Sequence, residues 1–359
     1  MTIEQRREKL ESLGRFLSQF KRQGIEKNES LPHNDPYFEI LKEKIESAVH
    51  HNGWFSLENV LFSLEQWSGA LTSDNLQKWL SGYDFSEVEP KTVGIIMAGN
   101  IPLVGFHDFI SVLVSGHRVL VKQSSNDKLL LPVIADYLKA VAPEWQNKIE
   151  LLPDSTDGAS KMTNFDAVIA TGSNNTARYF EYYFSGKPSI IRKNRNSVAV
   201  LTGNETSEEL LALAEDIFRY YGLGCRNVSK LYVPKNYDFN AFFEAVYPWN
   251  PITNQAKYAN NYDYNKAVYL MSQFQLLENG FLILKEDKSL NSPIATLFYE
   301  TYEDMDALQK ELDSRKEEIQ CVVGKHVVEN EVSFGQTQHP QLWDYADDVD
   351  TLAFLSQKV

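Results

Sequence analysis

The chain of 359 residues is poor in the residues that build disulfide frameworks and metal centres. It contains 2 cysteines and 7 histidines, and no His or Cys cluster has the spacing of metal ligands. Two cysteines in a chain of this length make no disulfide framework. We therefore expect neither a disulfide-stapled fold nor a metal site.

Long apolar runs and an excess of positive charge are also missing. The longest apolar runs, such as Phe109 to Val114, fall far short of the roughly 18 residues that a membrane span needs. The net charge of -14 argues against a general electrostatic footprint for nucleic acid or an anionic membrane. The opening residues 1–7 lack the apolar core of a signal peptide. We expect a cytoplasmic protein without a membrane span or a nucleic-acid partner.

The dinucleotide fingerprint G-x-G-x-x-G is absent after every strand that can be placed, which disfavours a standard Rossmann nucleotide site. What is present is ordinary core material, with a hydrophobic share of 43% and a charged share of 23%. These shares are typical of a soluble globular protein, and the length allows one large domain or two of ordinary size.

Residues 1–89 have the apolar periodicity of helices, with Leu10, Leu13 and Leu17 on one stripe. From residue 92 the pattern changes to a buried strand at 93–98, a helix at about 104–115 and a second strand, Arg118–Lys122. Strand, helix and strand at this spacing predict a βαβ unit and a parallel sheet, whose ligand crevice lies at the carboxyl ends of the strands.

Asn100 and Lys122 both fall at such strand ends. The Asn100 amide is suited to donate to a developing oxyanion, and Lys122 with Ser124 and Ser125 to hold a phosphate or a ribose. Each residue by itself is better explained without a ligand. Asn100 is then an ordinary turn residue before Pro102, and Lys122 a solvated strand end.

The next unit repeats the plan, with a helix at about 129–141 and strands at 149–152 and 166–170. The last strand leads into Thr171-Gly172-Ser173 and a helix that begins near residue 175. Free N–H groups and the helix dipole make such a turn a ready phosphate site. Ser173 is explained equally well as a helix cap.

Cys225 lies between a helix that carries Phe218 and a short strand at 231–233, beside Gly222 and Gly224. A cysteine reacts as its thiolate, which positive surroundings favour, and we expect Arg226 and Lys230 to supply that charge. The alternative is that Cys225 is a small buried hydrophobe.

The second cysteine, Cys321, fits that alternative well, because it lies in an apolar strand. The basic run 192–195, which precedes a strand at 197–201, is as well explained by a solvated loop as by a ligand role.

Four landmarks in this order resemble the aldehyde dehydrogenase superfamily: Gly99-Asn100-Ile-Pro-Leu103, Val119-Leu-Val-Lys122, Thr171-Gly172-Ser173 and Gly222-x-x-Cys225. The resemblance covers about residues 90–235, and Ser333-Phe-Gly-Gln336 looks like the family's closing Pro-Phe-Gly-Gly segment. It implies an α/β fold of two parallel-sheet domains with a helical N-terminal segment.

The resemblance also implies the roles of the site residues. Cys225 would be the nucleophile and Asn100 an oxyanion donor. The cofactor would be held by residues at the strand ends, which are Lys122, Ser124, Ser125, Gly172 and Ser173.

One departure from the family bears on the reaction. Aldehyde oxidisers carry Glu-Leu-Gly-Gly-Lys, whose glutamate activates the hydrolytic water, where this chain has Arg192-Lys-Asn-Arg-Asn196. A thioester on Cys225 would lack that base, which is typical of an enzyme that works between acyl-CoA and aldehyde. The ending 341–350 looks like the short acyl-CoA reductases related to the fatty acid reductase subunit of bacterial bioluminescence. We expect a fatty acyl-CoA reductase of that branch.

Two further departures concern the cofactor. Lys122-Gln-Ser-Ser125 replaces the family's Lys-Pro-Ser-Glu, so the acidic residue that would repel a 2′-phosphate is missing. We therefore expect NADPH as the cofactor, and NADH stays open as the alternative. Ser289-Leu-Asn-Ser-Pro293 lacks the carboxylate that usually grips the nicotinamide ribose.

We expect a helical segment over 1–89 packed on the cofactor domain, a dinucleotide-binding domain over 90–201, a catalytic thiol domain over 202–332 and a tail over 333–359 that closes the site. The rival functions are reduction of an acyl phosphate or of an acyl group delivered by a partner protein, and an inactive binding protein that keeps the fold. The sequence leaves homo-oligomerisation open.

Overall fold

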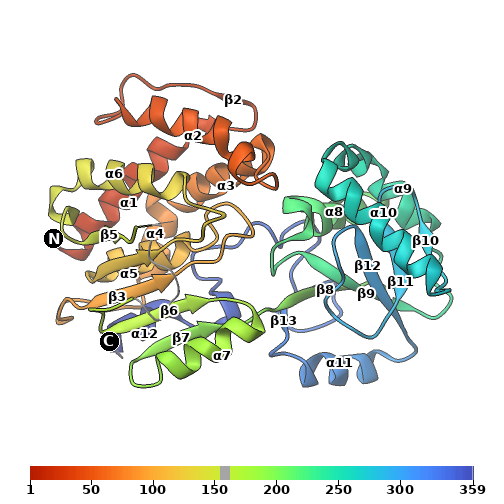
Figure 1. Cartoon of the computed structure of the whole chain (residues 1–359). Coiled ribbons are helices and arrows are strands. Elements are labelled where there is room, and N and C mark those ends of the chain that lie inside the picture. The colour runs from red at the N-terminus through yellow and green to blue at the C-terminus, as the bar shows by residue number, and fades with distance from the viewer. Residues whose placement is uncertain (154–161, 358) are drawn as a thin grey trace. The chain divides into compact units, whose positions relative to one another are not determined.

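The computed structural model describes residues 1–153, 162–357 and 359. The chain forms two compact units, one made of Met1–Lys193 and Gln341–Val359 and the other of Asn194–Pro340. Each unit is built on its own mainly parallel sheet (Figure 1). The expected α/β fold, with two parallel sheets and a helical N-terminal segment, is confirmed.

The first unit contains a five-stranded sheet in the order β5-β4-β3-β6-β7, in which all neighbours are parallel. Its strands are buried runs rich in valine and isoleucine, as expected of a parallel sheet covered on both faces. They are β3 (Thr92–Ile96), β4 (Arg118–Lys122), β5 (Ile149–Leu151), β6 (Ala167–Thr171) and β7 (Ser189–Arg192).

Helices cover both faces of this sheet. The larger core joins apolar side chains of the N-terminal helices to those of α5 and α6 on one face, whereas Phe180 and Phe184 of the α7 region pack against the other face. The helices are α1 (Ile3–Leu17), α2 (Tyr37–His51), α3 (Leu57–Ala70), α4 (Ser73–Leu80), α5 (Phe106–Ser115), α6 (Leu130–Val141), α7 (Asn174–Tyr183) and α12 (Thr351–Gln357). A small hairpin, β1 (Phe20–Lys21) and β2 (Gly24–Ile25), follows α1.

Two histidines, the half-buried His107 and the buried His117, hold the C-terminal residues on the first unit. His107 Nε2 donates to the Leu342 carbonyl over 2.8 Å, and His117 Nε2 donates to the Leu355 carbonyl over 2.9 Å. The other His117 nitrogen, Nδ1, accepts from the Lys91 N–H, so the ring is held in its neutral form. Burial lowers the pKa of both histidines below the ordinary value of 6.5.

This burial predicts that acid destabilises the first unit. An unfolded histidine takes up its proton near pH 6.5 whereas the folded one does not, so the free energy of unfolding falls as the pH drops below about 6.5. We expect His117→Gln to lose less stability than the wild type between about pH 7.5 and about pH 5.5, because it removes one such group. Urea unfolding of both proteins at the two pH values measures this, and equal losses would contradict it.

The second unit contains a six-stranded sheet in the order β10-β11-β12-β9-β8-β13, parallel except for the edge strand β10. In Figure 1, α8, α9 and α10 lie on one side of this sheet and α11 on the other. The strands are β8 (Asn196–Val200), β9 (Val228–Pro234), β10 (Leu277–Glu278), β11 (Ile283–Glu286), β12 (Thr296–Tyr302) and β13 (Ile319–Val323). The helices are α8 (Ser207–Phe218), α9 (Asn240–Val246), α10 (Ala256–Met271) and α11 (Met305–Ser314).

The division into units differs from the expected one at two points. Strand β8 pairs with β9 and β13, so the residues from 194 onward belong to the second sheet instead of the cofactor domain expected to extend to residue 201. The expected tail, 333–359, is shared, since residues 333–340 belong to the second unit and the rest to the first. Among the described residues, no helix is long and apolar enough to cross a membrane.

Candidate active site

The carboxyl ends of three paired strands bring most of the expected cofactor residues to one edge of the first sheet. Ile96 of β3 lies opposite Lys122 of β4 and Ala170 of β6, and all three strands run in the same direction. Asn100 and Gly172 therefore follow neighbouring strands at the same edge. The strand order also reverses between β3 and β6, which is where open α/β sheets bind their ligands.

The loop after β3, which carries Asn100, is fastened to the loop after β4. The Leu103 N–H donates to Asp127 Oδ2 over 2.7 Å, and burial raises the pKa of Asp127 to about 7. A Cβ at Gly99 would lie 2.4 Å from Ser124 Oγ, so only glycine allows this approach. Asn100 itself is exposed.

The expected cofactor residues after β4 differ in their surroundings. Lys122 ends β4 and is half-buried, and no side chain in the described part of the chain pairs with its ammonium group. Ser124 Oγ accepts from the Asn126 N–H over 3.2 Å, whereas Ser125 is exposed. Lys122 and Ser125 are thus the groups best able to meet a ligand here.

Ser173 is the N-cap of α7, because its Oγ accepts from the Thr176 N–H over 3.2 Å. Beside it, a Cβ on Gly172 would lie 3.0 Å from Thr176 and 3.1 Å from Phe180, so the strand-to-helix turn needs a small residue. The helix-cap interpretation of Ser173 holds, and its role toward a cofactor remains a prediction.

Arg192, the first residue of the basic run, does not lie in a solvated loop. It is buried at the end of β7, where it forms an ion pair with Asp108 of α5 and donates to Thr351 Oγ1 over 3.1 Å. The solvated-loop explanation is therefore wrong for Arg192, because the short strand β7, not expected from sequence, draws it into the core. Lys193 is exposed and pairs with Glu181 over 2.7 Å.

The two neighbouring cations give a matched test. Arg192→Met leaves the buried Asp108 carboxylate without its cation, and we expect a loss of about 3 to 5 kcal/mol in the free energy of unfolding. Lys193→Met removes only an exposed pair, for which about 1 kcal/mol or less is expected. Urea unfolding measures both, and similar losses in the two variants would contradict the structural role of Arg192.

Cys225 follows a left-handed turn at the end of α8. Tyr220 and Tyr221 have φ angles of 55° and 60°, and Gly222 has 76°, so three consecutive residues adopt a conformation that side chains disfavour. Cys225 is exposed on the turn that comes next, before β9. Cys321 is 5% exposed in β13, which confirms its expected role as strand filling.

A buried asparagine that sequence reasoning missed holds this turn. Asn227 Oδ1 accepts from the Gly224 N–H over 2.8 Å, and its Nδ2 donates to the carbonyls of Asp216 and Arg219 over 3.0 and 2.9 Å. Ser197 Oγ donates to the Cys225 carbonyl over 3.0 Å. The only signal in the sequence is an asparagine two residues beyond the cysteine.

Of the two cations expected to supply positive charge near Cys225, Arg226 lies next to the cysteine, whereas Lys230 is buried. Lys230 is fully buried in β9, where it forms an ion pair with Glu300 over 2.6 Å, so the expectation that its charge serves the thiol is wrong. It is drawn inward because β9 lies inside the sheet between β12 and β8, where residues 230–233 are all buried. Arg226, the neighbour of Cys225, donates from Nε to the Thr337 carbonyl over 2.6 Å.

Asp216 of α8 fixes the segment that resembles the family's closing motif. Its buried carboxylate accepts from the N–H of Gly335 and from the N–H and hydroxyl of Thr337. Burial raises the pKa of Asp216 to about 6. Through Thr337 and Arg226, this segment is joined to the Cys225 turn.

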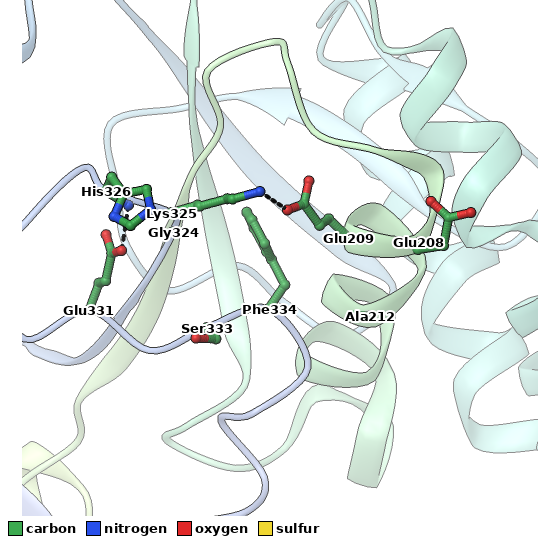
Figure 2. A pocket seen from close by; sticks show the side chains of 9 residues that line it. All are labelled: Glu208, Glu209, Ala212, Gly324, Lys325, His326, Glu331, Ser333 and Phe334. Atoms are coloured by element: carbon green, nitrogen blue, oxygen red, sulfur yellow. Dashed lines mark hydrogen bonds and ion pairs between the residues drawn. The ribbon is translucent and has the colours of Figure 1, made fainter.

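A separate cavity of about 450 Å³ opens in the second unit between the start of α8 and residues 324–334 (Figure 2). Lys325 pairs across it with Glu209, and Glu331 accepts from the backbone of His326. None of the expected site residues lines it, and these charged groups are engaged in holding the chain. In the described part of the chain, no group of three or more His, Cys, Asp or Glu residues is placed to hold a metal ion.

Comparison with solved structures shows the fold. The chain matches aldehyde dehydrogenase 21 from Physcomitrella patens, in complex with succinate, at a TM-score of 0.69 and 12% identity over 100% of this chain and 84% of that one. It also matches the P. syringae indole-3-acetaldehyde dehydrogenase, in complex with NAD+. The TM-score of this match is 0.65 and the identity 14%, over 90% of this chain and 72% of that one.

A third match is aldehyde dehydrogenase C from Pseudomonas syringae, in complex with NAD+ and octanal. It has a TM-score of 0.63 and 13% identity over 90% of this chain and 73% of that one. No sequence among the curated proteins matches the chain.

Sequence comparison with family models gives a more specific result. The model of the family described as acyl-CoA reductase (LuxC) matches residues 19–246, which is more than half of the chain and includes the segment from Asn100 to Cys225. The chain therefore belongs to the acyl-CoA reductase (LuxC) family, a family of oxidoreductases, and it has the fold of the aldehyde dehydrogenases.

Proposed function

We propose that the protein reduces an acyl-CoA, by expectation a fatty acyl-CoA, to the aldehyde with NADPH, through a thioester on Cys225. The observation that carries the proposal is the exposed Cys225 thiol on a turn fixed by buried hydrogen bonds, in a member of the acyl-CoA reductase family. The aldehyde dehydrogenase that holds octanal is compatible with an aliphatic product.

The chemistry assigned to Cys225 is nucleophilic. Its thiolate attacks the acyl carbonyl carbon, a bond forms between that carbon and Sγ, and the bond to the sulfur of CoA breaks, so that CoA leaves as the thiolate and takes up a proton from solvent. The Asn100 amide and the Cys225 N–H are the proposed donors to the oxyanion. After reduction, the carbon–Sγ bond breaks, the aldehyde leaves and the thiolate is regenerated.

The residue at position 192 supports reduction over oxidation. Arg192 stands where aldehyde oxidisers carry their glutamate, and its guanidinium is bound to Asp108 within the core. A thioester on Cys225 therefore has no carboxylate at this position to activate water. Its acyl group would be transferred to a thiol or reduced.

The cofactor residues proposed are Lys122, Ser124, Ser125, Gly172 and Ser173. The surroundings of these residues are compatible with a nicotinamide dinucleotide. The ends of the strands meet at one edge of the sheet, and Gly99 lets the neighbouring backbone approach closely there. The Lys122 ammonium group has no partner among the described residues and is available to a phosphate or a ribose. The bound cofactor would supply the hydride. NADPH is preferred over NADH because the segment from Lys122 to Ser125 contains no acidic residue.

Three variants test the proposal by their rates of aldehyde formation from a fatty acyl-CoA and NADPH. We expect Cys225→Ala to abolish the activity, because it removes the nucleophile, and Asn100→Ala to slow it about 100- to 1000-fold, which is typical of losing one oxyanion donor. Cys321→Ala is the matched control and should keep wild-type activity, since its thiol is buried in β13.

Normal activity in Cys225→Ala would refute the proposed mechanism. A wild type that reduces acyl phosphates but not acyl-CoA would favour the first rival function. A mild effect of Asn100→Ala would return Asn100 to an ordinary turn residue.

A further inference from the structure

We infer that Asn227 is a positioning residue for the Cys225 thiol, because its carboxamide fastens the end of α8 to the turn that carries the cysteine. The inference rests on the proposed function, since it gives Asn227 a part in the reaction of Cys225. Asn227 is 2% exposed, so it acts on the thiol through the backbone and contacts no substrate.

The end of α8 needs such a partner. The last carbonyls of a helix have no helical N–H to accept from. Here the chain leaves the helix through the left-handed residues Tyr220 and Tyr221, so it does not continue past these carbonyls as a helix. Asn227 Nδ2 donates to the carbonyls of Asp216 and Arg219, and thereby takes the place of missing helical N–H groups.

The same side chain closes the cysteine turn from the other side. Asn227 Oδ1 accepts from the N–H of Gly224, the residue before Cys225, and the Asn227 N–H donates to the Gly224 carbonyl over 3.0 Å. The two ends of the turn are therefore joined by a backbone bond and by the side chain. The Asn227 carboxamide therefore binds both the C-terminal end of α8 and the backbone next to Cys225.

Buried side chains hold the backbone on both sides of this exposed thiol through hydrogen bonds. Ser197 Oγ donates to the carbonyl of Cys225 itself, and Asn227 binds Gly224, the residue before it, whereas Cys321 is buried in the core. The bonds of Asn227 are shielded from water, which makes them stronger than bonds at the surface. They are thus suited to keep an exposed nucleophile in a constant orientation.

The role requires an amide in particular. Nδ2 must donate to carbonyls while Oδ1 accepts from an N–H, and an aspartate of the same shape can only accept when ionised. Asn227→Asp therefore keeps the bond to Gly224 but turns the bonds to Asp216 and Arg219 into repulsions. Asn265→Asp is the matched control, because Asn265 is a buried asparagine of α10 in the same unit whose Nδ2 donates to the Ile294 carbonyl over 2.9 Å.

The experiment measures acylation of the full-length protein by an acyl-CoA, together with alkylation of its cysteines by iodoacetamide at a series of pH values, both by mass spectrometry. We expect Asn227→Asp to lower the maximal rate of Cys225 acylation about 100-fold, as a small misplacement of a reacting group does. The acyl-CoA concentration at half-maximal rate should change much less. The pH profile of Cys225 alkylation should also shift, whereas Asn265→Asp should match the wild type in all three.

Equal effects of the two variants, or a wild-type acylation rate in Asn227→Asp, would overturn the inference. If Asn227→Asp does not fold, Asn227→Ala removes the same bonds without adding a charge and must show the same pattern. Failure of the proposed function looks different, because the wild type itself would then form no acyl-enzyme, while the shift in the alkylation profile would still report on positioning by Asn227.

Discussion

Parallel pairing of β3 with β4 on one side and with β6 on the other constrains where the chemistry of the first unit can lie. It brings Asn100, Lys122 and Gly172 to one edge of the sheet although long helical connections separate them in sequence. The loops at this edge are then fixed to each other by the Asp127 carboxylate and by the close approach of Gly99 and Ser124. The ends of neighbouring strands, and not any local motif, thus assemble the candidate cofactor site.

In the second unit the corresponding constraint is the way α8 ends. Two tyrosines in the left-handed region are unfavourable by themselves, and such residues persist only where the surrounding structure determines them. Here Asn227 binds the last carbonyls of α8, while the Asp216 carboxylate binds the segment that contains Gly335 and Thr337. Both groups act on the Cys225 turn from buried positions. The exposed Cys225 thiol therefore lies on a turn that buried hydrogen bonds hold, as its proposed role as nucleophile requires.

The sequence predicted the strand ends well because buried β-branched runs and turn residues are local signals. It did not predict α10, in which tyrosines and asparagines of modest helix propensity gain stability by burying Tyr258 and Tyr262 on one face. It also missed Asp216, whose partner Gly335 is 119 residues away, and it assigned Lys230 to the thiol although Glu300 of another strand pairs with it. These errors share a cause, because pairings between distant segments leave no trace in local pattern. The four family landmarks and the missing carboxylate at position 192 could be recognised from the sequence, because they do not depend on such long-range pairings.

The central claim is that Cys225 carries an acyl group that is reduced and not hydrolysed. The most direct measurement is the mass of the intact wild-type protein after mixing with a fatty acyl-CoA, first without and then with NADPH, followed by mapping of the modified peptide. The account predicts an adduct of one acyl group on Cys225 that persists without NADPH and disappears, with release of aldehyde, when NADPH is added. An adduct on Cys321, no adduct at all, or loss of the adduct to fatty acid in the absence of NADPH would contradict it.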